Sequence, residues 1–233
     1  MNSGIFIRGI IDDITNNKVA NSENHIENFE NKIENKNNNY KYTKYIRNDE
    51  YKNYIKKEVK NENELTIAIV GEYSGKTVYI NKLLNIEEDN PMSTNTCLIY
   101  EKKIKIKNSL ITFNLLDTTD WERKLLSLNK AILKFHKPHG IMIFFNLAYR
   151  QTFLNLINYK KKFENTEINL SDTPIVLIGN HLNGREIEVK SEEAIKFTKE
   201  NNFIGYFEIS LNGNNLDESF EYMANFLFKI YYS

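Results

Sequence analysis

Short apolar runs alternate with amphipathic stretches from Leu65 onward, and this alternation is the feature that most limits the fold. The apolar runs have the length and the Ile and Val content of buried strands, and the stretches between them have helical spacing. The predicted strands are 65–70, 97–107, 110–116, 140–147, 173–180 and 205–210, and the predicted helices are 76–84, 121–135, 150–163, 191–202 and 217–232. Repeated strand-helix units predict an α/β fold with a mainly parallel sheet and helices on both faces.

This sheet is expected to have six strands, of which one is antiparallel. The antiparallel strand comes from the hairpin of 97–107 and 110–116, whose turn is expected at Asn108 and Ser109. Ser191 is the expected N-cap of the helix at 191–202, where two glutamates favour the positive helix end.

The first 64 residues differ in composition from the rest of the chain. Stretches such as ENHIENFENKIENKNNNYKY are polar and repetitive, so they bury too little apolar surface to offset the entropy of ordering. The spacing of Ile26, Phe29 and Ile33 allows one narrow helical stripe. We therefore predict a mostly disordered or loosely helical extension over 1–64 and one folded domain over 65–233.

Composition narrows the class of protein. Thirty-one basic and 31 acidic residues give no net charge, so no strong field attracts nucleic acid. Cys97 is the single cysteine and fits a reducing compartment, and no apolar run approaches the roughly 18 residues of a membrane span. The start does not resemble a secretory signal, and no lipidation motif is present. We expect a cytoplasmic protein that has no direct membrane anchor and reaches a membrane only through a partner.

The stretch GEYSGKT (71–77) follows a predicted strand and opens a predicted helix, as a phosphate-binding loop does. Only three residues separate its two glycines, one fewer than in the usual pattern. Either Gly71 opens a short loop, or Val70 takes the first glycine position of a full-length loop. A β-branched residue is costly at positive φ, which favours the short loop. A purely structural turn with a surface lysine is the alternative to a phosphate site.

Later segments resemble Rab-like and Ras-like small GTPases. DTTDWER (117–123) is similar to their D-T-A-G-Q-E-R segment, and the spacing from Thr94 to Asp117 matches that of Rab proteins. The stretch 174–202, with NHLN at 180–183, resembles the segment that carries their N-K-x-D motif. FEISLNGNNLDESF resembles the S-A-K region before the last helix. The resemblance covers about residues 65–232 and implies a P-loop small-GTPase fold.

The resemblance also implies which residues form the site. Lys76 would reach the phosphates, Thr77 and Asp117 would hold Mg²⁺, and Thr94 would close over the metal and the γ-phosphate; a plain loop threonine is the alternative, since Thr96 lies close by. The full set of implied nucleotide-binding residues is Gly71, Glu72, Tyr73, Ser74, Gly75, Lys76, Thr77, Thr94, Asp117, Asp120, Asn180, His181, Asn183, Ser210 and Leu211, and the implied metal ligands are Thr77, Thr94 and Asp117.

Two positions of the switch II segment and two of the guanine motif depart from the family pattern, and Leu211 and Asn212 replace the last two residues of the S-A-K region. Trp121 replaces the catalytic glutamine, and its indole cannot accept a hydrogen bond from the attacking water. Asp120 replaces a glycine beside the γ-phosphate, where a carboxylate costs up to about 4 kcal/mol at 4 Å and an effective dielectric near 20. His181 and Asn183 replace the lysine and the aspartate of the guanine motif. An amide in place of the aspartate weakens guanine preference by roughly 10- to 100-fold.

Two functions are therefore expected from the sequence. One is a divergent nucleotide-dependent switch that binds GTP or GDP with Mg²⁺, selects guanine weakly and hydrolyses GTP slowly or not at all, in vesicle traffic. The other is a pseudo-GTPase scaffold without turnover. In both, protein effectors or regulators bind the switch surface and nucleic acid does not. The pair His136 and His139 is expected at a solvated helix end rather than in a metal site.

Overall fold

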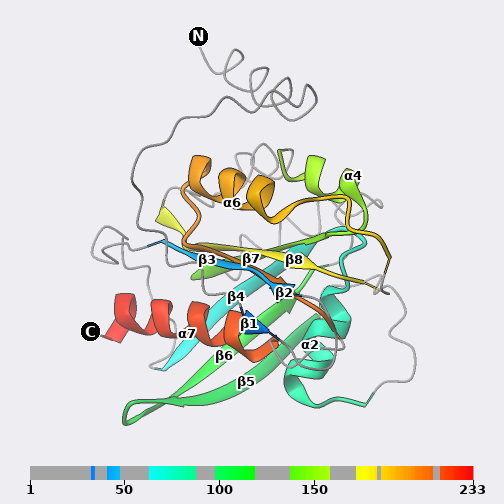
Figure 1. The fold of residues 1–233 in the computed structure, drawn as a ribbon. Coiled ribbons are helices and arrows are strands. Elements are labelled where there is room, and N and C mark those ends of the chain that lie inside the picture. The colour runs from blue at the N-terminus through cyan, green and yellow to red at the C-terminus, as the bar shows by residue number, and fades with distance from the viewer. Residues whose placement is uncertain are drawn as a thin grey trace. The chain divides into compact units, whose positions relative to one another are not determined.

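The chain divides into two compact units, residues 1–30 and 31–233. The computed structural model describes residues 33–34, 41–47, 63–87, 98–118, 137–157, 172–182, 185–211 and 216–232, all of which belong to the second unit. The described elements of the second unit form one large sheet with helices on both sides, together with a two-stranded sheet (Figure 1). The fold is therefore the α/β architecture that the sequence predicts.

The large sheet has seven strands in the order β3-β9-β8-β7-β4-β6-β5. The five strands from β9 to β6 pair in parallel, and the strand at each edge is antiparallel to its neighbour. The bounds are β3 Lys44–Ile46, β4 Glu64–Gly71, β5 Leu98–Ile106, β6 Ser109–Asp117, β7 Gly140–Asn146, β8 Ile175–Asn180 and β9 Gly205–Ile209. The two-stranded sheet pairs β1 (Ile33–Glu34) with β2 (Lys41–Tyr42).

The seventh strand corrects the predicted count of six. Lys44–Ile46 pairs with β9 and lies inside the segment that we assigned to the extension. Three residues are too few to show an alternating pattern, so composition concealed this strand. The strand covers backbone groups that β9 would otherwise expose at the edge of the sheet. The boundary between extension and domain at residue 64 stays a prediction.

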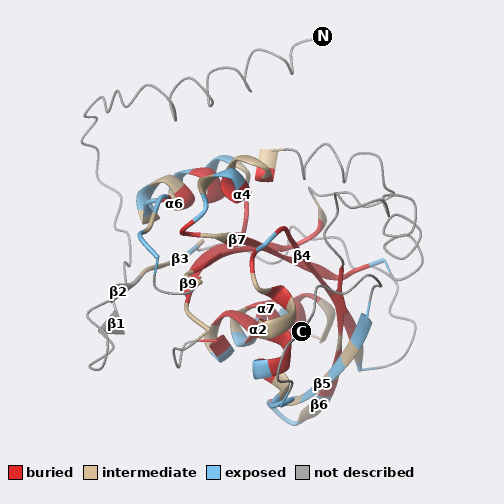
Figure 2. Cartoon of the chain, turned by 90° about the vertical axis from the view of Figure 1, so that its right-hand side faces the viewer, coloured by how far each residue is buried: buried red, intermediate tan, exposed pale blue. Residues whose placement is uncertain are grey.

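Two helical layers cover the sheet, each over its own apolar core. Helices α2 (Lys76–Leu84) and α7 (Leu216–Tyr232) pack on one face, and α4 (Arg150–Leu154) and α6 (Ser191–Glu200) pack on the other (Figure 1). The central strands are buried on both faces, whereas the β5–β6 hairpin has exposed positions (Figure 2). The predicted helix at 121–135 lies outside the described residues.

Two local predictions are wrong by one residue. The hairpin turn is at Lys107 and Asn108, and Lys107 takes the left-handed conformation at φ 53°. Helix α6 begins at Ser191 itself, so Lys190 is its N-cap. The backbone N–H of Lys190 donates to Glu193 Oε2 at 3.3 Å, so the N3 residue Glu193 caps this helix from inside the first turn.

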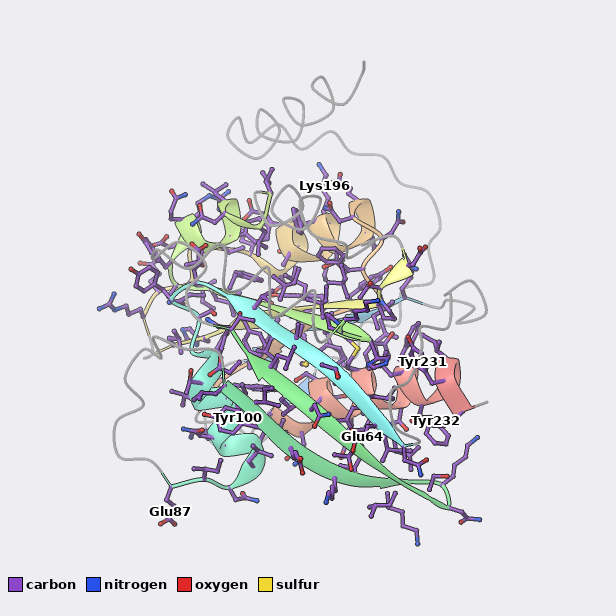
Figure 3. The ribbon with its side chains drawn as sticks, turned by 180° about the vertical axis from the view of Figure 1, so that it is seen from behind. Glu64, Glu87, Tyr100, Lys196, Tyr231 and Tyr232 are labelled. Atoms are coloured by element: carbon purple, nitrogen blue, oxygen red, sulfur yellow. The ribbon has the colours of Figure 1, made fainter. Side chains whose placement is uncertain are left out.

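His139 also departs from expectation, because it lies in the core rather than at a solvated helix end. Its side chain is 5% exposed and its Nδ1 accepts a hydrogen bond from the Thr66 backbone N–H at 2.8 Å. The His139 ring packs edge-on against Tyr231, with centroids 5.0 Å apart. Figure 3 labels Tyr231 at the end of α7, so this contact joins the last helix to the amino-terminal edge of the sheet.

Candidate functional site

The glycine loop begins at the carboxyl end of β4. The strand continues through Gly71, one residue further than predicted, and Gly71 pairs with Phe144 on β7. Gly71 has φ +146°, and a Cβ atom there would lie 2.3 Å from the Phe144 carbonyl oxygen. Val70 is a buried strand residue without positive φ. The need for glycine therefore falls on Gly71, which supports the short-loop interpretation.

Left-handed backbone conformations shape the rest of the loop. Tyr73 has φ 47° and Gly75 has φ 75°, and Gly75 is the N-cap of α2. Left-handed residues before a helix can turn neighbouring N–H groups to one side, which is how backbone nests bind anions. The Lys76 ammonium is buried and donates to the Gly71 carbonyl, so it lies across this loop.

Thr77 and Asp117 meet where β4 and β6 end side by side. The Thr77 hydroxyl donates to Asp117 Oδ2 at 2.7 Å, and Asp117 is fully buried as the last residue of β6. Next to it, the Thr118 hydroxyl donates to the Ile69 carbonyl at 2.9 Å and ties this strand end to β4. A hydroxyl and a buried carboxylate are oxygen ligands of the kind that Mg²⁺ prefers, so these residues fit a magnesium ion.

Three residues from the ends of β8 and β9 surround Gly75 on the other side of the loop. The Asn180 amide, fully buried at the end of β8, donates to the Ser74 carbonyl at 2.7 Å. A Cβ atom on Gly75 would lie 2.9 Å from Asn180 Nδ2, 3.0 Å from Leu182 Cδ2 and 3.1 Å from Leu211 Cδ1. The candidate base site and the loop are therefore in direct contact, as expected where parallel strands end at one edge.

Two buried polar atoms at this junction favour a polar ligand. The Ser74 hydroxyl and the Asn180 side-chain oxygen are buried and have no hydrogen-bond partner among the described residues. Buried polar groups are normally paired, so atoms of this kind need an explanation. A nucleotide bound at the loop would offer both of them partners.

His181 has a structural partner of its own. Its Nε2 lies 2.7 Å from the Arg185 carbonyl, and its backbone N–H donates to Ile209 at the end of β9. Nearby, the Lys82 ammonium on α2 donates to the Leu211 carbonyl, which fastens the loop after β9 to the helix that follows the glycine loop. His181 thus holds the chain after β8, and Leu211 joins the two sides of the site.

Four predicted site residues lie outside the described residues: Thr94, Asp120, Trp121 and Asn183. Cys97 and His136 lie outside them as well. The others come together at one edge of the sheet: Gly71, Glu72, Tyr73, Ser74, Gly75, Lys76, Thr77, Asp117, Asn180, His181, Ser210 and Leu211.

Sequence reasoning missed three residues that support this site. Leu182 packs at Gly75, and Thr118 holds the strand end beside Asp117. Both lie inside motifs that resemble those of the family, so their place in NHLN and DTTDWER could have identified them. Asn155 donates to the buried Glu72 carboxylate at 3.0 Å, and nothing in the pattern around 150–163 singles it out.

The described part of the site joins a buried strand, a glycine loop and a helix in the order that a P-loop domain has. A model of the Ras family matches residues 66–229, more than half of the chain. The chain belongs to the Ras family. Members of this family generally bind GTP or GDP with Mg²⁺, and the residues around Thr77 and Asp117 fit that chemistry.

Two relatives illustrate the relationship. This Ras-family chain is 35% identical over 136 residues to the Ras-related protein Rab-11B of Dictyostelium discoideum, covering 57% of each chain. It is 27% identical over 155 residues to the Ras-related protein Rab-9A of Rattus norvegicus, covering 63% of this chain and 74% of that protein. The chain thus spans little more than half the length of the first relative. None of its described helices is long and apolar enough to cross a bilayer.

Proposed function

We propose that this Ras-family chain is a nucleotide-dependent switch that binds GTP or GDP with Mg²⁺, selects guanine weakly and hydrolyses GTP slowly. The hydrogen bond from Thr77 to the buried Asp117 carries the proposal, since it joins the two described metal-ligand candidates. A relic of the site would have no need to keep a buried carboxylate beside a hydroxyl, because burying a charge is costly.

The described residues of the site have the following roles in this proposal. The loop N–H groups and the α2 N-terminus bind phosphate oxygens, and Lys76 exchanges its bond with the Gly71 carbonyl for one with a phosphate. Thr77 and Asp117 would hold the metal, which would supply charge neutralisation for the phosphates. Asn180 keeps the base site against the loop through Ser74.

Weak base selection follows from the sequence of the guanine motif. Asn183 offers one acceptor and one donor where an aspartate would accept twice, so phosphates and Mg²⁺ supply most of the affinity. We expect GDP to bind no more than about a thousandfold more tightly than ADP, or roughly 4 kcal/mol. Competition binding of GDP, ADP and XDP measures this, and a larger preference for GDP contradicts weak selection.

The test of nucleotide binding is retention through purification. The protein is purified with Mg²⁺ or with a chelator, and the bound nucleotide is released and quantified. We expect retention with Mg²⁺ and loss with the chelator, and Thr77→Ala should lose nucleotide under both conditions. Thr112→Ala, on a half-buried strand position outside the site, is the matched control. Equal retention by wild type and Thr77→Ala would contradict the proposal.

A scaffold without turnover is the second candidate, and the identities of Asp120 and Trp121 favour it. Asp120→Gly should mainly strengthen GTP binding, because it removes a charge beside the γ-phosphate. Trp121→Gln should mainly raise the single-turnover rate, because it restores an acceptor for the attacking water. If the wild type alone hydrolyses GTP at or above roughly 10⁻⁴ per second, the scaffold proposal and slow hydrolysis are both wrong.

The partners follow from the same reasoning. The likeness to Rab proteins supports a place in vesicle traffic, with effectors and regulators bound at the switch surface. We propose a cytoplasmic protein whose membrane association depends on one of these partners. Co-sedimentation with vesicles of the purified chain, alone and with a candidate effector, tests this, and binding by the chain alone contradicts it.

A further inference from the structure

Glu72 places a carboxylate in a loop shaped to bind anions. It is the only acidic residue of GEYSGKT, and its side chain is 3% exposed. A negative charge among backbone N–H groups can compete with phosphate for them, and it repels phosphate as well. A loop that contains such a residue needs a means of keeping the carboxylate away from the phosphate position.

Asn155 supplies that means from the far side of the loop. It stands at the end of α4, the helix that follows β7, and its Nδ2 donates to Glu72 Oε2 at 3.0 Å. The Glu72 carboxylate is thereby directed from the glycine loop toward α4. Since Gly71 already contacts Phe144 of β7, both of these loop residues are held by the segment 144–155.

The orientation of the Asn155 amide is itself set by a neighbour. Gln151 lies one helical turn earlier, and its Nε2 donates to Asn155 Oδ1 at 2.9 Å. With its oxygen paired to a donor, the amide presents its NH₂ group to Glu72, which is the orientation that a carboxylate requires. The backbone N–H of Asn155 is fixed as well, by the Gln151 carbonyl at 3.0 Å.

We propose that Asn155 is a positioning residue of the nucleotide site, which holds the Glu72 carboxylate against α4 and out of the phosphate-binding loop. The inference rests on the proposed nucleotide binding. It assigns to the chain its own device for tolerating a carboxylate in the loop: an amide donor 83 positions away in sequence.

The experiment compares GDP and GTP affinities, with Mg²⁺, for wild type, Asn155→Ala, Glu72→Gln and the double variant. Asn155→Ala removes the donor that holds the Glu72 carboxylate toward α4, so we expect affinity to fall by about tenfold or more, and further for GTP than for GDP because GTP carries more charge. Glu72→Gln removes the charge and should bind at least as tightly as wild type. The double variant should recover the affinity lost in Asn155→Ala.

Asn225→Ala is the matched control, since Asn225 is an exposed α7 residue whose amide bonds to the Glu221 carbonyl one turn earlier. It should bind nucleotide as wild type does. Thermal unfolding without nucleotide checks that each variant is folded.

Three outcomes would overturn the inference, and they are distinguishable. If Asn155→Ala binds both nucleotides as wild type does, Asn155 has no positioning role. If the double variant binds nucleotide as weakly as Asn155→Ala does, Asn155 supports the backbone rather than restraining the Glu72 charge. If wild type itself binds neither nucleotide, the proposed function fails and this inference fails with it.

Discussion

The hydrogen bond of the Tyr206 hydroxyl can be tested as a contribution to stability beside the edge strand β3. Tyr206 is fully buried on β9, and its hydroxyl donates to Glu208 Oε1 at 2.9 Å. The other carboxylate oxygen of Glu208 accepts the backbone N–H of Thr43, just before β3, at 3.1 Å. The buried Glu208 side chain thus joins a core tyrosine to the edge of the sheet.

Tyr206→Phe removes one hydroxyl and leaves the ring in place. A hydrogen bond to a charged group contributes about 1.5–3 kcal/mol, and its loss leaves the buried Glu208 oxygen with one donor fewer. In a domain of this size each 1 kcal/mol lowers Tm by about 2–4 °C, so Tyr206→Phe should lower Tm by roughly 3–12 °C. Chemical denaturation at neutral pH should show the corresponding loss in the free energy of unfolding.

Tyr79→Phe is the matched control, because Tyr79 is also a fully buried tyrosine but has a neutral partner. Its hydroxyl lies 3.0 Å from the Ser219 hydroxyl, and burial raises the pKa of Tyr79 well above its ordinary value, so the group stays protonated. Loss of a neutral hydrogen bond costs about 0.5–1.5 kcal/mol. Tyr206→Phe should therefore cost about twice as much as Tyr79→Phe.

A second comparison isolates the charge on Glu208. In a Glu208→Gln background the Tyr206 hydroxyl has a neutral acceptor, so Tyr206→Phe should there cost no more than Tyr79→Phe. If Tyr206→Phe costs the same in both backgrounds, or no more than Tyr79→Phe in the wild type, the charge-assisted bond is not what makes this contact strong.

Three further changes have defined outcomes. Gly71→Ala should destabilise the fold by more than about 2 kcal/mol in chemical denaturation, since its Cβ would meet the Phe144 carbonyl and the backbone would be strained; a loss under 1 kcal/mol would contradict this. Burial raises the pKa of Glu193, but hydrogen bonds and charge from Arg150 and the Lys190 N–H outweigh it and lower the pKa overall. The ionised Glu193 side chain thus stabilises the fold above the unfolded pKa of about 4.3, and this stabilisation is lost as pH falls through the folded pKa. At this partly exposed site Glu193→Gln should lower the free energy of unfolding by less than about 1 kcal/mol at neutral pH, and the difference from wild type should vanish when denaturation is repeated at acid pH. A difference that grows as pH falls would contradict a lowered pKa. Asn183→Asp should raise the preference for GDP over ADP by roughly 10- to 100-fold in competition binding, and no change would mean that this position does not face the base.

The parallel core of the fold was predictable because its information is local. Strands such as 140–146 are apolar on both faces, and this pattern survives without knowledge of their neighbours. The same holds for the loop, where the positive φ of Gly71 and Gly75 coincides with the only two glycines of the motif. Contacts that depend on folding were not predictable. Asn155 and Glu72 are 83 positions apart in sequence, and neither residue type indicates which partner it will bind.

The edge strand shows the same limit and has a consequence for the site. Because β3 is antiparallel to β9, Lys44 pairs with Phe207 and the Glu208 N–H donates to the Thr43 carbonyl. Going backward from Lys44, the chain therefore advances toward the carboxyl end of β9, the end that leads into Ser210 and Leu211. A strand of three residues carries no pattern that predicts this, since its partner strand determines its place. The register brings Thr43 toward the carboxyl end of β9, and backbone hydrogen bonds join residues 43–47 to the large sheet although they are distant from β9 in sequence.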